Sequence, residues 1–62
     1  MIFRLRYRQA GGHIHCRLFE SPGPHQTFAL NGTLTFDERS WPAFLLQLYR
    51  TNIEVMEEGD EV

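Results

Sequence analysis

The sequence predicts an α+β fold: a small antiparallel β-sheet of three to four strands with one helix, from the C-terminal half, packed on one face. Apolar and polar residues alternate over 2–8 and again over 13–19, with a Gly-Gly pair between the two runs. Apolar residues at helical spacing follow over 41–49. Sixty-two residues enclose a single core, so we expect one domain over residues 1–56.

The first two segments are predicted to form a β-hairpin. Both carry their apolar residues on one side and arginines or histidines on the other. The turn residues Gly11 and Gly12 accept the positive φ angles of a type I′ turn. A two-residue loop at these glycines pairs Tyr7 with Cys16, whereas a four-residue loop over 9–12 pairs Tyr7 with Ile14. Either register keeps apolar side chains opposite apolar ones.

A loop over 21–24 precedes two further strand-like stretches, 26–30 and 33–36. Between them stands Asn31-Gly32, a pair that favours a tight turn or a β-bulge. The stretches therefore form either a second hairpin or one bent strand.

A helix is predicted to begin after Ser40, a good N-cap, with Pro42 in its first turn. We expect it to end near Asn52, which tolerates the left-handed conformation of a helix C-terminus. Residues 53–56 alternate again and can add a short final strand, whereas 57–62 should be an acidic, flexible tail. The predicted core comprises Phe3, Leu5, Ile14, Leu18, Leu34, Phe36, Trp41, Phe44, Leu45 and Leu48.

The net charge is −2, which argues against bulk attraction to nucleic acid or anionic lipid. The charge is unevenly spread, because residues 1–25 hold four arginines against one glutamate, whereas residues 26–62 hold two arginines against seven acids. A single cysteine excludes an internal disulfide and fits a reducing compartment. No segment has the length and apolarity of a membrane span or signal peptide, so a cytoplasmic protein is expected.

The candidate site is the hairpin face turned away from the helix, here called the arginine face. It gathers cationic and imidazole side chains beside one aromatic ring: Arg4, Arg6, Arg8, His13, His15, Arg17 and Phe19. Such a face suits an acidic patch of a partner protein, or a single-stranded nucleic acid that stacks and pairs on it. The simplest alternative is a solvated polar surface covered by the acids of the C-terminal segment, namely Glu54, Glu57, Glu58, Asp60 and Glu61.

No pattern supports catalysis or a cofactor. His13 and His15 have a spacing that can chelate zinc or nickel, but Cys16 points to the opposite face and only His25 remains as a third ligand. Two ligands make a poor site, so no metal is expected. Cys16 is interpreted as a small buried apolar residue, and we expect no enzyme activity.

Three stretches resemble short uncharacterised proteins of bacteriophages and prophages: Gly-Gly-His-Ile-His-Cys-Arg-Leu-Phe, Thr-Phe-Ala at 27–29, and the run from Asn31 to Trp41. The resemblance covers roughly residues 4–45 and rests on turn glycines, strand residues and a tryptophan that opens a helix. It implies a phage accessory protein and carries over no activity or site residue.

The leading hypothesis is thus a non-enzymatic protein that binds a host or phage protein, with a nucleic-acid-binding module as the alternative. A small homodimer is also expected, because several apolar residues have no place in the predicted core: Phe19, Phe28, Leu30, Leu46 and Tyr49.

Overall fold

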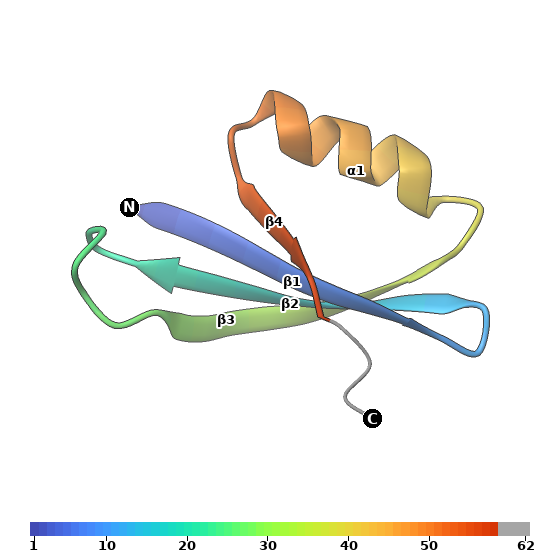
Figure 1. The fold of residues 1–62 in the computed structure, drawn as a ribbon, viewed down its shortest axis with the longest axis horizontal. Helices are drawn as coiled ribbons and strands as arrows, with labels where there is room; N and C mark the ends of the chain where they lie inside the picture. Colours follow the sequence, from blue (N-terminus) through green and yellow to red (C-terminus); the bar gives the residue numbers. More distant parts are fainter. Residues whose placement is uncertain (59–62) are drawn as a thin grey trace.

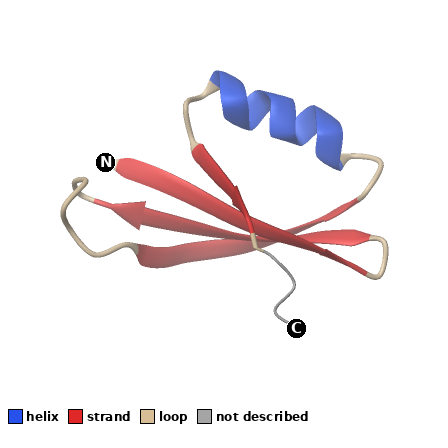
Figure 2. Ribbon diagram, in the orientation of Figure 1, coloured by secondary structure: helices blue, strands red, loops and turns tan. Residues whose placement is uncertain are grey.

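The computed structural model, which describes residues 1–58, shows an α+β fold with one helix above a four-stranded sheet (Figure 1). The predicted fold class is confirmed. In chain order the elements are β1 (Ile2–Ala10), β2 (His13–Ser21), β3 (Ala29–Asp37), α1 (Trp41–Arg50) and β4 (Glu54–Glu57). Figure 2 shows that the helix covers one face of the sheet and leaves the other uncovered by any helix. No helix in the described part of the chain has the length and apolarity to cross a membrane.

The sheet order is β3-β2-β1-β4, so the first hairpin occupies the centre. β1 pairs with β2 in the register of the two-residue loop, with Tyr7 opposite Cys16. Gly11 and Gly12 have φ angles of 60° and 77°, as a type I′ turn requires. The hairpin prediction is therefore confirmed, and the register that the sequence left open is settled.

β3 is one strand rather than a hairpin. Its pairing with β2 shifts between Leu18 and Phe19, where Leu18 lies opposite Gly32 and Phe19 lies opposite Leu30. Asn31 is the extra residue of this β-bulge, and its side-chain amide donates to Glu20 at 2.9 Å. Of the two alternatives for Asn31-Gly32, the bent strand is correct.

The possible short final strand is present as β4 and runs parallel to β1, so the sheet is mixed, with three antiparallel strands and one parallel edge. The helix crosses over the sheet between β3 at one edge and β4 at the other, so β4 starts at the same end as β1. The strand extends to Glu57, and the backbone N–H of Glu58 donates to the Tyr7 carbonyl at 2.7 Å. These two residues, expected to begin the tail, thus belong to the sheet edge, and residues 59–62 lie outside the described part.

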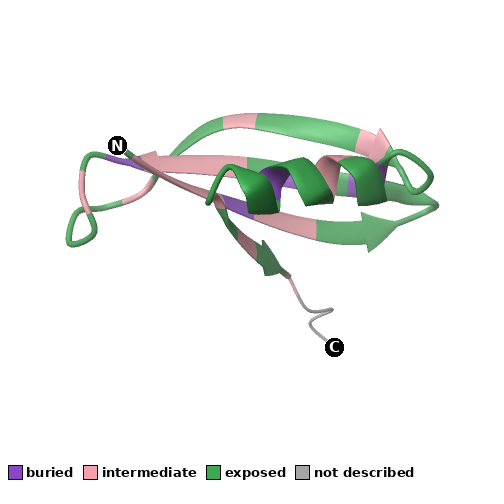
Figure 3. Ribbon diagram, turned by 90° about the horizontal axis from the view of Figure 1, so that it is seen from above, coloured by how far each residue is buried: buried purple, intermediate pink, exposed green. Residues whose placement is uncertain are grey.

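The core lies between the helix and the sheet, where Figure 3 shows buried segments beneath the helix. Leu5, Ile14, Cys16, Trp41 and Leu48 are buried, and Leu18, Phe36, Phe44 and Leu45 pack against them. Two expected core residues differ: Phe3 is half-buried but does not pack against this cluster, and Leu34 is 45% exposed. Leu34 remains open because β3 is an edge strand, with no strand on its outer side among residues 1–58.

The helix begins after Ser40, but the Ser40 hydroxyl makes no capping hydrogen bond. In the turn before the helix, the Asp37 carboxylate accepts the backbone N–H groups of Arg39 at 3.0 Å and Ser40 at 2.8 Å. At the other end Asn52 adopts φ 61°, as expected. The N–H groups of Asn52 and Ile53 return to the carbonyls of Tyr49 and Leu48, which is the Schellman pattern.

The backbone N–H of Ser40, which donates to the Asp37 carboxylate, holds the pKa of Asp37 below the ordinary value of 3.8. A depressed folded-state pKa adds stability that is complete above the unfolded value and is lost as the pH falls through the folded one. Between about pH 5 and about pH 2 the free energy of unfolding, measured with urea, should fall less in Asp37→Asn than in the wild type. Glu38→Gln, which also replaces a carboxylate with an amide, should show the same fall as the wild type. An equal fall in the two variants would contradict the assignment to Asp37.

Candidate binding face

The structure places all seven predicted site residues on the face of the sheet away from the helix. Opposite pairs across β1 and β2 hold most of them: Arg4 with Phe19, Arg6 with Arg17, and Arg8 with His15. His13 continues the same face of β2, and its Nδ1 lies 3.0 Å from the carbonyl oxygen of Gly11. Strand alternation alone therefore assembles the arginine face.

Guanidinium groups lie over the aromatic rings at one end of this face. The Arg4 guanidinium carbon is 4.2 Å from the centroid of Phe28, and those of Arg6 and Arg17 are each 5.8 Å from the centroid of Phe19. These are cation–π distances. The two phenylalanines, expected to be free for a dimer contact, are thus partly covered by the protein's own arginines, whereas Leu30, Leu46 and Tyr49 are exposed.

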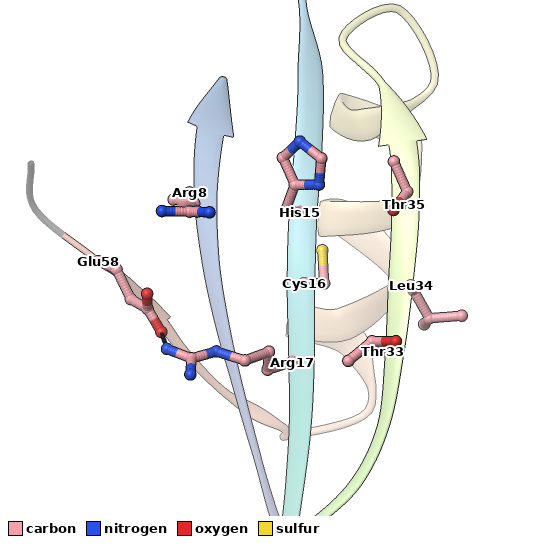
Figure 4. A pocket seen from close by; sticks show the side chains of 8 residues that line it. All are labelled: Arg8, His15, Cys16, Arg17, Thr33, Leu34, Thr35 and Glu58. Atoms are coloured by element: carbon pink, nitrogen blue, oxygen red, sulfur yellow. Dashed lines mark hydrogen bonds and ion pairs between the residues drawn. The ribbon is translucent and has the colours of Figure 1, made fainter. Parts of the chain in front are cut away.

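Two acids from the C-terminal segment also reach the arginine face. The Nε of Arg4 donates to Glu54 at 3.2 Å, and Arg17 forms an ion pair with Glu58. Figure 4 shows the Arg17 side chain crossing β1 to reach Glu58. Glu57 has the opposite orientation in β4, since it pairs with the helix-facing Tyr7. Asp60 and Glu61, which were considered as further cover, lie outside the described residues.

Between these groups lies a hollow of about 380 Å³ at the other end of the face. Its polar lining comes from three strands and the residue after β4: Arg8, His15, Arg17, Thr33, Thr35 and Glu58. The side chains are drawn in Figure 4. Two guanidinium groups, an imidazole and two hydroxyls offer hydrogen-bond donors to an oxyanion. Glu58 already supplies one such carboxylate to Arg17.

Among residues 1–58, the arginine face retains a positive balance. Four arginines oppose the two acids that contact them, and among residues 1–58 neither Arg6 nor Arg8 forms an ion pair. Arg8 is exposed and borders the hollow. The C-terminal acids therefore neutralise Arg4 and Arg17, as the alternative interpretation expected. Within the described residues they do not neutralise Arg6 or Arg8.

The sequence pattern missed three contributors to this face: Phe28, Thr33 and Thr35. The threonines alternate with Leu34 and Phe36, so their position on the polar face follows from the strand period. Phe28 reaches the face from the loop before β3, and no local pattern signals its contact with Arg4.

The structure also places the two histidines and the cysteine that the sequence singled out. Within residues 1–58 no three His, Cys, Asp or Glu side chains gather as metal ligands, so His13 and His15 gain no third partner there. Cys16 is 2% exposed, and burial raises the pKa of its thiol, which keeps it in the unreactive protonated form.

The geometry defines a cationic face with hydrogen-bond donors around a hollow at one end. Comparison of the chain with protein-family models, with curated proteins and with solved structures gave no match. The function therefore has to be argued from the face itself.

Proposed function

We propose that the protein is a small non-catalytic binding protein whose arginine face docks an acidic surface of a partner protein. The observation that carries this proposal is the Arg17–Glu58 ion pair beside the hollow. There a carboxylate of the chain already occupies the arrangement that a partner's Asp or Glu would take. Arg8, which forms no ion pair among the described residues, supplies a second guanidinium at the same hollow.

A protein ligand fits this face better than a single-stranded nucleic acid. Nucleic-acid platforms stack bases on open aromatic rings. Here the Arg4 guanidinium lies 4.2 Å above Phe28, and two arginines approach Phe19. The donors of the hollow suit a carboxylate from an acidic peptide without disturbing those contacts. A host or phage protein, as the sequence resemblance implies, is our proposal for the source of that acidic surface.

Titration with an oligoglutamate peptide at low salt tests the proposal, with an oligothymidylate of equal length in a parallel arm. We expect the peptide to bind, and Arg8→Glu to weaken binding roughly tenfold, because the reversal removes an attraction and adds a repulsion. Arg50→Glu makes the same charge change on the helix, on the other side of the sheet, and should leave affinity nearly unchanged. Absence of peptide binding, or preference for the oligonucleotide, would refute the proposal.

The ion pair with Glu58 predicts a second effect in the same titration. Because Glu58 competes with the peptide for Arg17, Glu58→Gln should tighten peptide binding by roughly two- to fivefold. The matched control is Glu57→Gln, which removes the same charge from a residue paired on the helix-facing side. Equal gains in the two variants would show that only net charge matters and would contradict a specific role for Glu58.

A further inference from the structure

The outer edge of β3 is the other unusual surface of the fold. β3 spans nine residues and ends the sheet, with β2 as its only neighbour in the described structure. From Ala29 to Phe36 it contains no charged residue and no proline. Protein sheets commonly protect exposed edges with charges, prolines or very short strands. The opposite edge follows that rule, because β4 has four residues and begins and ends with glutamate.

The hydrogen-bonding groups that β3 presents follow from the hairpin register. In a two-residue hairpin the residues that flank the turn, here Ala10 and His13, form a hydrogen-bonded pair. Because hydrogen-bonding direction alternates along a strand, the even-numbered residues of β2 direct their backbone N–H and C=O groups toward β3. The hydrogen bond from the Glu38 N–H to the Gly12 carbonyl, at 3.2 Å, is consistent with this direction. In β3, the residues paired with them include Leu34 and Phe36, whose backbone groups therefore face β2. The backbone groups of Thr33 and Thr35 are consequently directed to the open edge.

We propose that β3 pairs antiparallel with β3 of a second copy of this chain, with Leu34 opposite Leu34 of the partner. The proposal stands apart from the function of the arginine face. The β-bulge at Asn31 bends the start of the strand, so the regular pairing segment is 32–36, which is symmetric about Leu34. A second copy fits because this segment carries no charge for an acidic or basic strand to recognise, and none that repels itself.

The register follows from the alternation. Placing the two-fold axis at Leu34 makes Thr33 and Thr35 hydrogen-bonded pairs with Thr35 and Thr33 of the partner, which uses the open backbone groups. Leu34 becomes a non-hydrogen-bonded pair, the type in which side chains lie closest. Its side chain is 45% exposed and extends past the edge of β3 in Figure 4, so a second Leu34 would cover it. Asp37 then faces Asn31 rather than another acid.

Engineered cysteines test this register directly. In a Cys16→Ala background, Leu34→Cys should form an intermolecular disulfide on mild oxidation, because Cα atoms in such pairs are about 4.5 Å apart, within disulfide range. Thr35→Cys in the same background is the matched control and should remain reduced, since the partner's Thr33 faces it. Equal cross-linking of both variants, or of neither, would overturn the proposed pairing.

Sedimentation tests the same interface without a cross-link. We expect a species of twice the 7.3 kDa monomer mass at high micromolar concentration. Thr35→Pro should abolish it, because proline removes an edge N–H that no internal bond uses, whereas Thr35→Val keeps the N–H and the dimer. A wild-type protein that stays monomeric, or a dimer that persists in a folded Thr35→Pro variant, would overturn the proposal. If that variant fails to fold by circular dichroism, the cysteine pair decides.

Discussion

Replacement of Trp41 by alanine is expected to unfold the protein. Trp41 is 8% exposed and contacts three aromatic rings, with centroid distances of 4.7 Å to Tyr7, 5.9 Å to Phe36 and 5.8 Å to Phe44. Truncation of a buried Trp or Phe to alanine costs about 3–5 kcal/mol. A domain below about 70 residues rarely has more than that in reserve. The variant should therefore lose its cooperative thermal transition, as followed by far-ultraviolet circular dichroism.

The matched control is Tyr49→Ala, an aromatic truncation on the same helix at a side chain that is 62% exposed. It should change the free energy of unfolding by about 0.5 kcal/mol or less. Trp41→Phe keeps a ring in the cluster and should lose less than Trp41→Ala. If Trp41→Ala melted within a few degrees of the wild type, the aromatic cluster would not be the centre of the core.

The second large effect is expected at Ser21, which the sequence pattern places in an ordinary loop. Ser21 is fully buried, and its Oγ lies 2.6 Å from the Gly23 carbonyl oxygen and 3.2 Å from that of Gln26. The hydroxyl thereby ties the end of β2 to the loop that follows it. Ser21→Ala removes this buried hydroxyl and its hydrogen bonds to the loop, which costs about 0.5–1.5 kcal/mol. In urea unfolding, the variant should have a lower midpoint concentration than the wild type and an unchanged m-value.

Ser40→Ala is the control for that measurement, because it removes the same hydroxyl from a residue that makes no side-chain capping bond. We expect its free energy of unfolding to stay within about 0.5 kcal/mol of the wild type. Equal losses at both serines would mean that the Ser21 hydrogen bonds contribute nothing. A larger loss at Ser40 would instead restore the capping role that the sequence suggested.

Much of the fold follows from short-range pattern. Alternation assigns the two faces of β1 and β2. The double glycine indicates a turn between them and leaves open only which of two registers the hairpin adopts. The helix end at Asn52 is equally local, because a left-handed residue there completes the backbone bonds of Tyr49 and Leu48. These features depend on residues within a few positions of one another, and sequence reasoning captures such interactions well.

The features that sequence did not predict depend on distant partners. Sequence left both a turn and a bulge open at Asn31, and the pairing of Leu18 with Gly32 and of Phe19 with Leu30 selects the bulge. Leu34 has the pattern of a core residue, but its strand lies at the edge. Ser40 precedes the helix without a capping bond from its hydroxyl, and the Asp37 carboxylate instead binds the N–H groups of the turn residues Arg39 and Ser40.

In the candidate site, too, local pattern predicts some features and distant contacts determine the others. The seven residues of the arginine face are correctly grouped, because strand periodicity alone puts them together. Their partners, Phe28, Glu54 and Glu58, are separated from them in sequence by the loop or by the helix. Whether a guanidinium is already paired decides what it can bind, and that information lies in tertiary contacts.

The pairing of the first strand with the last also constrains how the chain folds. Arg4 lies beside Glu54, fifty residues away, so the parallel pair forms only after nearly the whole described chain has been brought together. Closing so long a loop carries an entropic penalty before any contact offsets it. Folding should accordingly be slow for a domain of this size, on the order of milliseconds to seconds, with β4 joining after the central hairpin.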